Sequence, residues 1–221
     1  MELLVITLAY TTPGRDAEVL ARIRLISDTV RNAPGLLTSR FYRSRGEDSY
    51  YFMLTTWDDE ESWQRAQERH NPKRLLLNTA AEILTASPQQ WLMNYLWGYH
   101  RPAATPIVAA AHLANIRPDQ ADFAQKGCIE GLRHHASRPT LAFAFLARGA
   151  YERNTPSNVT QGAPDNNSID PSYRQGPMFL SLFSWGSEEE REDFYADTHY
   201  RALQKFLGNL GTIHILPLEP M

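Results

Sequence analysis

Two stretches of the sequence decide the fold, because they repeat one pattern. Tyr51 to His70 reads YFMLTTWDDEESWQRAQERH, and Phe179 to Tyr200 reads FLSLFSWGSEEEREDFYADTHY. Each is an apolar run that ends in Trp, followed by an acidic cluster, a helical run and a His. We expect a strand and then a helix in each case, since carboxylates suit the positive N-terminal end of a helix. The pattern predicts one structural unit that occurs twice.

The flanking segments extend this repeat. Residues 3–19, LLVITLAYTTPGRDAEV, align without a gap on residues 106–122, PIVAAAHLANIRPDQAD. Both begin as an alternating strand, pass through a turn with Pro and continue as an amphipathic helix, which we expect at about residues 15–32 and 118–135. Further strands are expected in each half, LLTSRFYRS with QQWLMNYLW and TLAFAFLAR with TIHILPL. Each half therefore reads as βαββαβ, the ferredoxin-like unit.

The predicted fold class is α+β, with two ferredoxin-like repeats packed sheet to sheet within one chain. The repeats would span residues 1–101 and 102–221. The second carries an insertion at about 150–177, rich in Asn, Pro, Ser and Gly, which is either a lid or a disordered excursion. A four-stranded sheet with both helices on one face leaves its other face bare. We therefore expect the two sheets to face each other across a cavity.

Composition limits the partners and the compartment. The net charge is −3, with 22 basic and 25 acidic residues that are scattered along the chain, so no nucleic-acid partner is expected. No apolar run approaches the roughly 18 residues that span a bilayer, so no membrane partner is expected. The lone Cys128 and an N-terminus without a basic region favour a cytoplasmic protein. The assembly state is expected to be a monomer or a homodimer.

The spacing of the Trp, acidic and His residues resembles the antibiotic biosynthesis monooxygenase (ABM) family. Trp185 precedes the run ADTHY, which contains His199, and the spacing from Trp57 to His70 is one residue shorter than that from Trp185 to His199. The stretch NAPGLLTSRFYRS resembles the family's turn into its second strand. The resemblance implies the dimeric α/β-barrel fold. That superfamily includes cofactor-independent oxygenases of anthrones and quinols, haem-degrading enzymes, isomerases, peroxidases and proteins of unknown role.

The same resemblance bears on cofactors. Haem-degrading members use an Asn on the first strand, where Thr7 and Ala110 stand in this sequence. The anthrone-oxygenase type needs only polar and aromatic pocket residues that form a substrate carbanion, which meets O2 directly. We therefore expect no cofactor and a small aromatic or hydrophobic substrate with O2. Reduced flavin as a co-substrate and haem remain open.

Strand alternation yields the predicted catalytic residues. If Leu4 and its alternate neighbours lie under the helices, Thr7 and His112 face the cavity. Aligning the last strands places Asn94 on His214, and a cavity position would spare these polar groups an unpaired burial. We predict His112, His214 and Asn94 as the catalytic group, with a His as general base near neutral pH. A structural role for each strand His is the alternative.

The predicted substrate-binding residues are strand side chains of the cavity together with the Trp and His residues of the repeated motif: Thr7, Tyr51, Trp57, His70, Phe143, Phe179, Trp185 and His199. For the two Trp residues, packing in the core is the competing interpretation. No spacing of Cys, His and Asp indicates zinc or iron, so no metal site is predicted.

Three functions compete. The leading hypothesis is an ABM-like monooxygenase that oxidises an aromatic or polyphenolic molecule of the anthrone or quinol type in secondary metabolism. The second is a non-oxidative isomerase or cyclase on the same barrel. The third is a non-catalytic protein that binds a hydrophobic ligand or haem.

Overall fold

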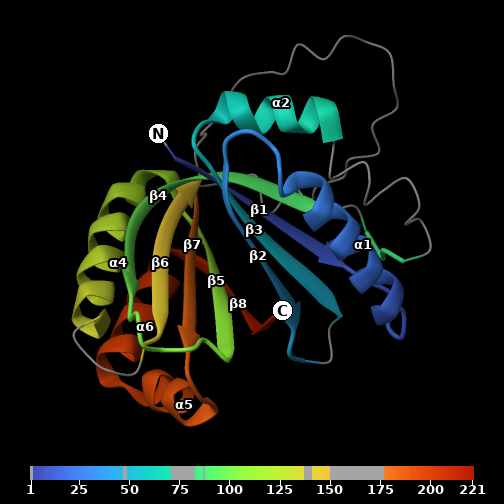
Figure 1. Ribbon diagram of the computed structural model, residues 1–221. Coiled ribbons are helices and arrows are strands. Elements are labelled where there is room, and N and C mark those ends of the chain that lie inside the picture. The colour runs from blue at the N-terminus through green and yellow to red at the C-terminus, as the bar shows by residue number, and fades with distance from the viewer. Residues whose placement is uncertain (1, 47–48, 71–82, 87, 137–140, 150–176) are drawn as a thin grey trace.

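The computed structural model describes residues 2–46, 49–70, 83–86, 88–136, 141–149 and 177–221 (Figure 1). The predicted insertion at 150–177, with its alternatives of a lid or a disordered excursion, lies almost entirely outside these residues.

The order of elements follows the predicted repeat. The first half contains β1 (Leu3–Tyr10), α1 (Asp16–Val30), β2 (Leu36–Ser44), β3 (Tyr50–Trp57), α2 (Glu60–His70) and β4 (Gln89–His100). The second contains β5 (Val108–Ile116), the short 3-10 helix η1 (Pro118–Gln120), α4 (Ala121–Ala136), β6 (Phe143–Gly149), β7 (Met178–Trp185), α5 (Glu188–Ala196), α6 (Thr198–Leu210) and β8 (Gly211–Pro220). Two helices, α5 and α6, stand between β7 and β8, where the sequence predicted one helical run.

The polar residues after each strand-ending Trp begin the helices. Asp59 Oδ1 accepts a hydrogen bond of 2.7 Å from the Ser62 amide, and Ser187 Oγ accepts one of 3.1 Å from the Glu190 amide. These bonds satisfy amides that have no partner within the helix. Gly35 ends the turn before β2 with φ of +85°, and a Cβ there would collide with the Asp58 and Ser62 side chains. Only glycine fits such a position without strain.

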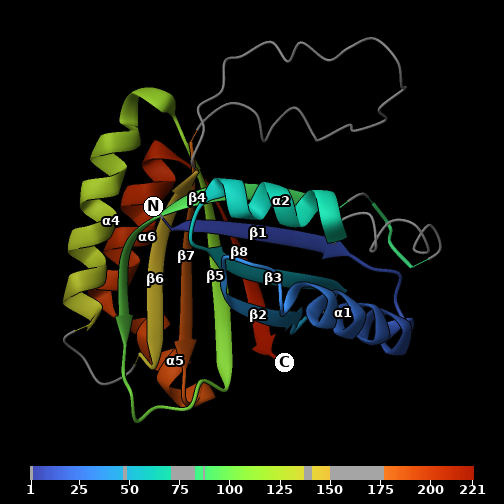
Figure 2. The same cartoon turned by 45° about the horizontal axis from the view of Figure 1, so that its top comes forward.

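The eight strands close into an antiparallel barrel in the order β1-β3-β2-β8-β5-β7-β6-β4. Each half supplies four neighbouring strands, and its helices lie on the outside of the barrel (Figures 1 and 2). The halves meet at two unequal seams. Between β4 and β6, pairing runs from Met93–Gly149 to His100–Phe143, whereas β2 and β8 pair only at Tyr42–Pro220, Arg43–Glu219 and Ser44–Leu218. The predicted fold class is confirmed.

The interior of the barrel is filled by side chains, so the predicted chamber between the sheets is wrong. Apolar residues of both halves pack there as one buried cluster: Leu4, Ile6, Leu8, Tyr42, Tyr50, Phe52, Leu54, Met93, Ala109, Ala111, Leu113, Phe145, Ala147, Met178, Leu180, Leu182 and Leu218. Leu4 and its alternate neighbours on β1 therefore point inward, and Thr7 points outward toward the helices. The predicted face assignment is reversed.

The pairing register also corrects the alignment of the two halves. Leu3 pairs with Trp57, and Val108 pairs with Trp185. Thr7 is therefore equivalent to His112, and the gapless sequence alignment is displaced by two residues. On the neighbouring strands, Gln90 pairs with Thr7 and Ile215 pairs with His112. The predicted equivalence of Asn94 and His214 is consequently wrong.

Within the described part of the chain, no helix is both long and apolar enough to cross a membrane.

Candidate functional site

A hollow lies on the outer face of the first-half sheet, beneath α1. It holds about 560 Å³ of empty space, part of which is open to solvent. We call it the first-half pocket, and its lining consists of Thr7, Ala9, Thr11, Val19, Ile23, Ile26, Phe41, Tyr51, Phe52, Met53, Leu84 and Gln90. The lining side chains that come from α1 are all apolar, and so are most of those that come from the strands. Such a surface suits a hydrophobic ligand.

A polar pair stands in this apolar wall. Gln90 Nε2 donates a hydrogen bond of 3.2 Å to Thr7 Oγ1, across the paired strands β4 and β1. Thr7 is buried and Gln90 is half-buried. Among the described residues, the Thr7 hydroxyl hydrogen and the Gln90 carbonyl oxygen have no partner. The pair can therefore offer one donor and one acceptor to a ligand.

A second polar group lies one row further along the sheet. Tyr51 pairs with Ala9, and its hydroxyl donates a hydrogen bond of 3.0 Å to Asp16 Oδ1 at the start of α1. Burial, and then the hydrogen bond to Asp16, raise the pKa of Tyr51 to about 12. The phenol is therefore protonated at neutral pH. Asp16, in contrast, is exposed.

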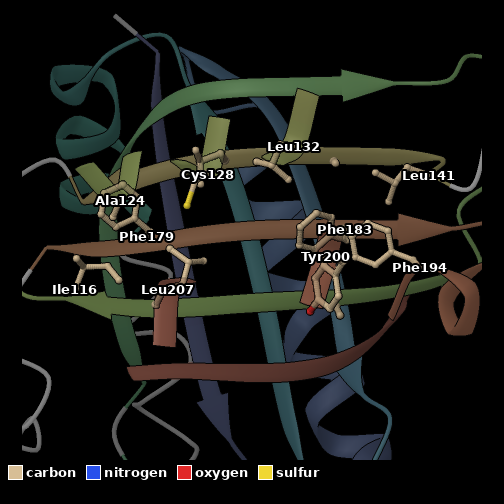
Figure 3. Packing of buried hydrophobic residues seen from close by; sticks show 14 of the residues in the cluster. Ile116, Ala124, Cys128, Leu132, Leu141, Phe179, Phe183, Phe194, Tyr200 and Leu207 are labelled. Atoms are coloured by element: carbon tan, nitrogen blue, oxygen red, sulfur yellow. The ribbon is translucent and has the colours of Figure 1, made fainter. Parts of the chain in front are cut away.

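The equivalent region of the second half is filled. His112 stands where the first half has Thr7, and its Nε2 lies 3.0 Å from Tyr195 Oη. Its Nδ1 lies 3.3 Å from Tyr200 Oη and 3.4 Å from Gln204 Nε2. The Tyr200 and Phe183 rings pack against it. Figure 3 shows both rings within the layer of buried side chains on this side of the sheet.

Burial governs the charge of this imidazole. It lowers the pKa of His112 to about 3, because the charged form would be desolvated. His112 is therefore neutral at physiological pH, and both ring nitrogens already have partners. These contacts favour a structural role, and catalysis by His112 stays a prediction.

The other two predicted catalytic residues lie apart from His112. His214 is on the neighbouring strand, as expected, but it pairs with Leu113, so it points to the opposite face from His112, and it is exposed. Asn94 pairs with Leu3 and shares the outer face of the first-half sheet. The structure therefore does not bring these three side chains into one cavity.

Among the predicted substrate-binding residues of the first half, Thr7 and Tyr51 line the pocket. Trp57 is buried and donates a hydrogen bond of 3.0 Å from Nε1 to Thr55 Oγ1, which is a core contact. His70 is the last residue of α2, and its side chain lies outside the described part of the structure.

The predicted residues of the second half are distributed over three places. Phe179 and Trp185 are buried in the layer between the sheet and the helices. Phe143 packs on the barrel interior, with the Arg40 guanidinium 4.3 Å from its ring centroid. His199 is exposed at the start of α6, with its ring 4.0 Å from that of His134.

Sequence reasoning missed Gln90 and Asp16. Gln90 became significant only through the register that pairs it with Thr7. Asp16 was visible as an acid at the start of a helix, but its contact with Tyr51 joins residues 35 positions apart. No local signal carries either relationship.

No group of three or more His, Cys, Asp or Glu side chains that could hold a metal ion occurs among the described residues.

The class of protein follows from this geometry: a tandem ferredoxin-like barrel of the dimeric α/β type with an apolar pocket between one sheet and its helix. Residues 3–73 match the model of the family described as antibiotic biosynthesis monooxygenase. The matched residues lie in the half of the chain that holds the pocket. No curated protein matches the sequence.

Solved structures with the same fold cover the whole chain. One is described as an anthrone oxidase-like protein, with 14% identity and a TM-score of 0.74 over 100% of this chain and 91% of that chain. A second, from Fusobacterium nucleatum, is described as a "Putative monooxygenase", with 6% identity and a TM-score of 0.72 over 99% and 92% of the two chains. A third is described as a major regulator of staphylococcal pathogenesis, with 10% identity and a TM-score of 0.56 over 98% and 99%. At these identities the similarity establishes the fold alone.

Proposed function

We propose that the protein is an ABM-type monooxygenase that oxidises an aromatic or polyphenolic molecule of the anthrone or quinol class with O2. The substrate binds in the first-half pocket. The observation that carries this proposal is an apolar hollow that contains the Thr7–Gln90 pair, with one donor and one acceptor available. That hollow lies in the half of the chain that matches the ABM family.

The pocket suits this chemistry for a physical reason. Apolar walls exclude water from a bound phenol or ketone, and the Thr7 hydroxyl can donate to the substrate oxygen on which negative charge develops. The resulting carbanion can react with O2 directly. We therefore propose that neither a metal nor a tightly bound cofactor is needed, and that reduced flavin is dispensable.

The test is oxygen uptake with a panel of anthrones and hydroquinones, without added metal or flavin. Thr7→Val, which keeps the shape and removes the hydroxyl, should lower kcat/KM about 10-fold, the equivalent of one hydrogen bond of about 1.4 kcal/mol. Thr38→Val is the matched control, because Thr38 is exposed on β2 and bonds Thr56 away from the pocket. A folded protein without uptake on any substrate would contradict the proposal.

Ligand binding without chemistry is the second candidate function. It is favoured by the lining itself, which contains no carboxylate, imidazole or amine side chain among the described residues. Saturable binding of an anthrone without turnover, in air and under argon alike, would establish it. Turnover that persists under argon would instead identify an isomerase or cyclase, and a Soret band on addition of haemin would identify a haem protein.

A further inference from the structure

The proposed oxygenation needs a group that removes a proton from the substrate, and the described pocket lining lacks an ordinary base. One lining residue is bonded to a carboxylate: the Tyr51 hydroxyl donates a hydrogen bond to Asp16. We propose that Asp16, acting through the Tyr51 hydroxyl, accepts the substrate proton. This inference rests on the proposed function.

The geometry of the pair supports such a relay. Tyr51 lines the pocket and is buried, while its Oη donates to Asp16 over 3.0 Å. Among the described residues, Oη accepts no hydrogen bond, so a lone pair is available to a substrate. Asp16 is exposed, so it can return a proton to solvent after turnover.

The protonation state of Tyr51 requires the partner. A phenol with a pKa of about 12 is not a base at neutral pH. It can take a proton from the substrate only as it passes its own proton to Asp16. Arg43, on the neighbouring strand β2, interacts electrostatically with both Tyr51 and Asp16, and it forms an ion pair of its own with Glu219.

The step balances without an external reductant. The acidic C–H bond of the substrate breaks, its proton passes to Tyr51 Oη, and the Oη–H proton passes to Asp16 Oδ1. The electron pair stays on carbon and reacts with O2, which gives a substrate hydroperoxide once a proton returns. Loss of water then converts the original CH2 into a carbonyl. One oxygen atom enters the product, the other leaves as water, and the four electrons come from the substrate.

Substitution of the acceptor tests the relay. Asp16→Asn keeps an oxygen that can accept the Tyr51 hydrogen bond but cannot hold the proton, so kcat should fall about 100-fold or more with little change in KM. Tyr51→Phe should show the same loss, and Asp16→Glu should restore part of it. Two controls should leave kcat unchanged: Tyr50→Phe, whose hydroxyl bonds the Pro217 carbonyl, and Asp28→Asn, which is exposed near the end of α1.

A pH profile separates this role from a structural one. In the wild type, kcat should fall at acid pH, and this fall should vanish in Asp16→Asn while the thermal unfolding midpoint is retained. If the wild type takes up oxygen and Asp16→Asn does so equally well, the relay is wrong and the proposed function stands. If the folded wild type takes up no oxygen on any substrate, both are wrong.

Discussion

The two halves of this barrel share one fold, and one equivalent position in the layer between sheet and helices holds Thr7 in the first half and His112 in the second. Around Thr7 the layer between sheet and helix contains a hollow with an available donor and acceptor. Around His112 the same layer is filled by aromatic rings, and the imidazole nitrogens are engaged by Tyr195, Tyr200 and Gln204. A repeated scaffold can thus leave a hollow in one copy and pack the equivalent region with side chains in the other.

Filling the first-half pocket with a large side chain should give the largest difference between the two halves. Ala9 and Ala114 occupy equivalent, buried positions, but only Ala9 borders the hollow. Ala9→Phe should abolish binding and turnover with little loss of stability, because the ring enters empty space. Ala114→Phe should destabilise the protein by about 1–3 kcal/mol through overpacking and leave ligand affinity unchanged. Calorimetric titration and denaturant unfolding measure the two effects.

The opposite pattern would contradict this assignment. Retained ligand binding in Ala9→Phe, with loss of binding in a folded Ala114→Phe, would place the site in the second half.

The acid stability of the protein should depend on His112. Its folded pKa of about 3 lies below the unfolded value of about 6.5, so the unfolded state binds more protons between these limits. The contribution of neutral His112 to the free energy of unfolding is therefore fully present above pH 6.5. It is lost as the pH falls toward 3, by up to about 1.4 kcal/mol per pH unit. Urea unfolding of His112→Gln should show a flatter acid limb than the wild type. Equal slopes in the wild type and in His112→Gln would refute the neutral, buried imidazole.

The two strand-ending Trp residues should show the smallest difference between the halves, a difference in unfolding free energy. Trp57 Nε1 donates to Thr55, whereas Trp185 Nε1 is buried without a partner among the described residues, because Phe183 takes the place of Thr55. Trp57→Phe should therefore cost about 1 kcal/mol more in unfolding free energy than Trp185→Phe, one hydrogen bond's worth. Equal losses in the two variants would mean that this bond contributes nothing.

Much of the fold could be predicted because it depends on local pattern. The Trp and acidic residues mark the end of β3 and β7 and the start of the next helix in both halves, and LLTSRFYRS coincides with β2. The closing of two such sheets on each other followed from the need to bury their bare faces. These features need no knowledge of register.

The site could be predicted only in part, for two physical reasons. Strand β1 is buried on both faces, so alternation could not tell the barrel interior from the helix layer, and the choice was wrong. The first strands of the two halves are both apolar, so their sequences can be aligned equally well at more than one offset. The gapless alignment is therefore displaced by two residues, and it does not match Thr7 with His112. The predicted substrate-binding residues nonetheless include Thr7 and Tyr51. Side chains on one face of a sheet stay together even when that face is assigned to the wrong side.

The most direct test of the central claim is a crystal structure of the protein with a bound anthrone or hydroquinone. The account predicts the ligand between α1 and strands β1 and β3, with its oxygen within hydrogen-bond distance of Thr7 or Gln90. A ligand found inside the barrel, or against His112 in the second half, would contradict it.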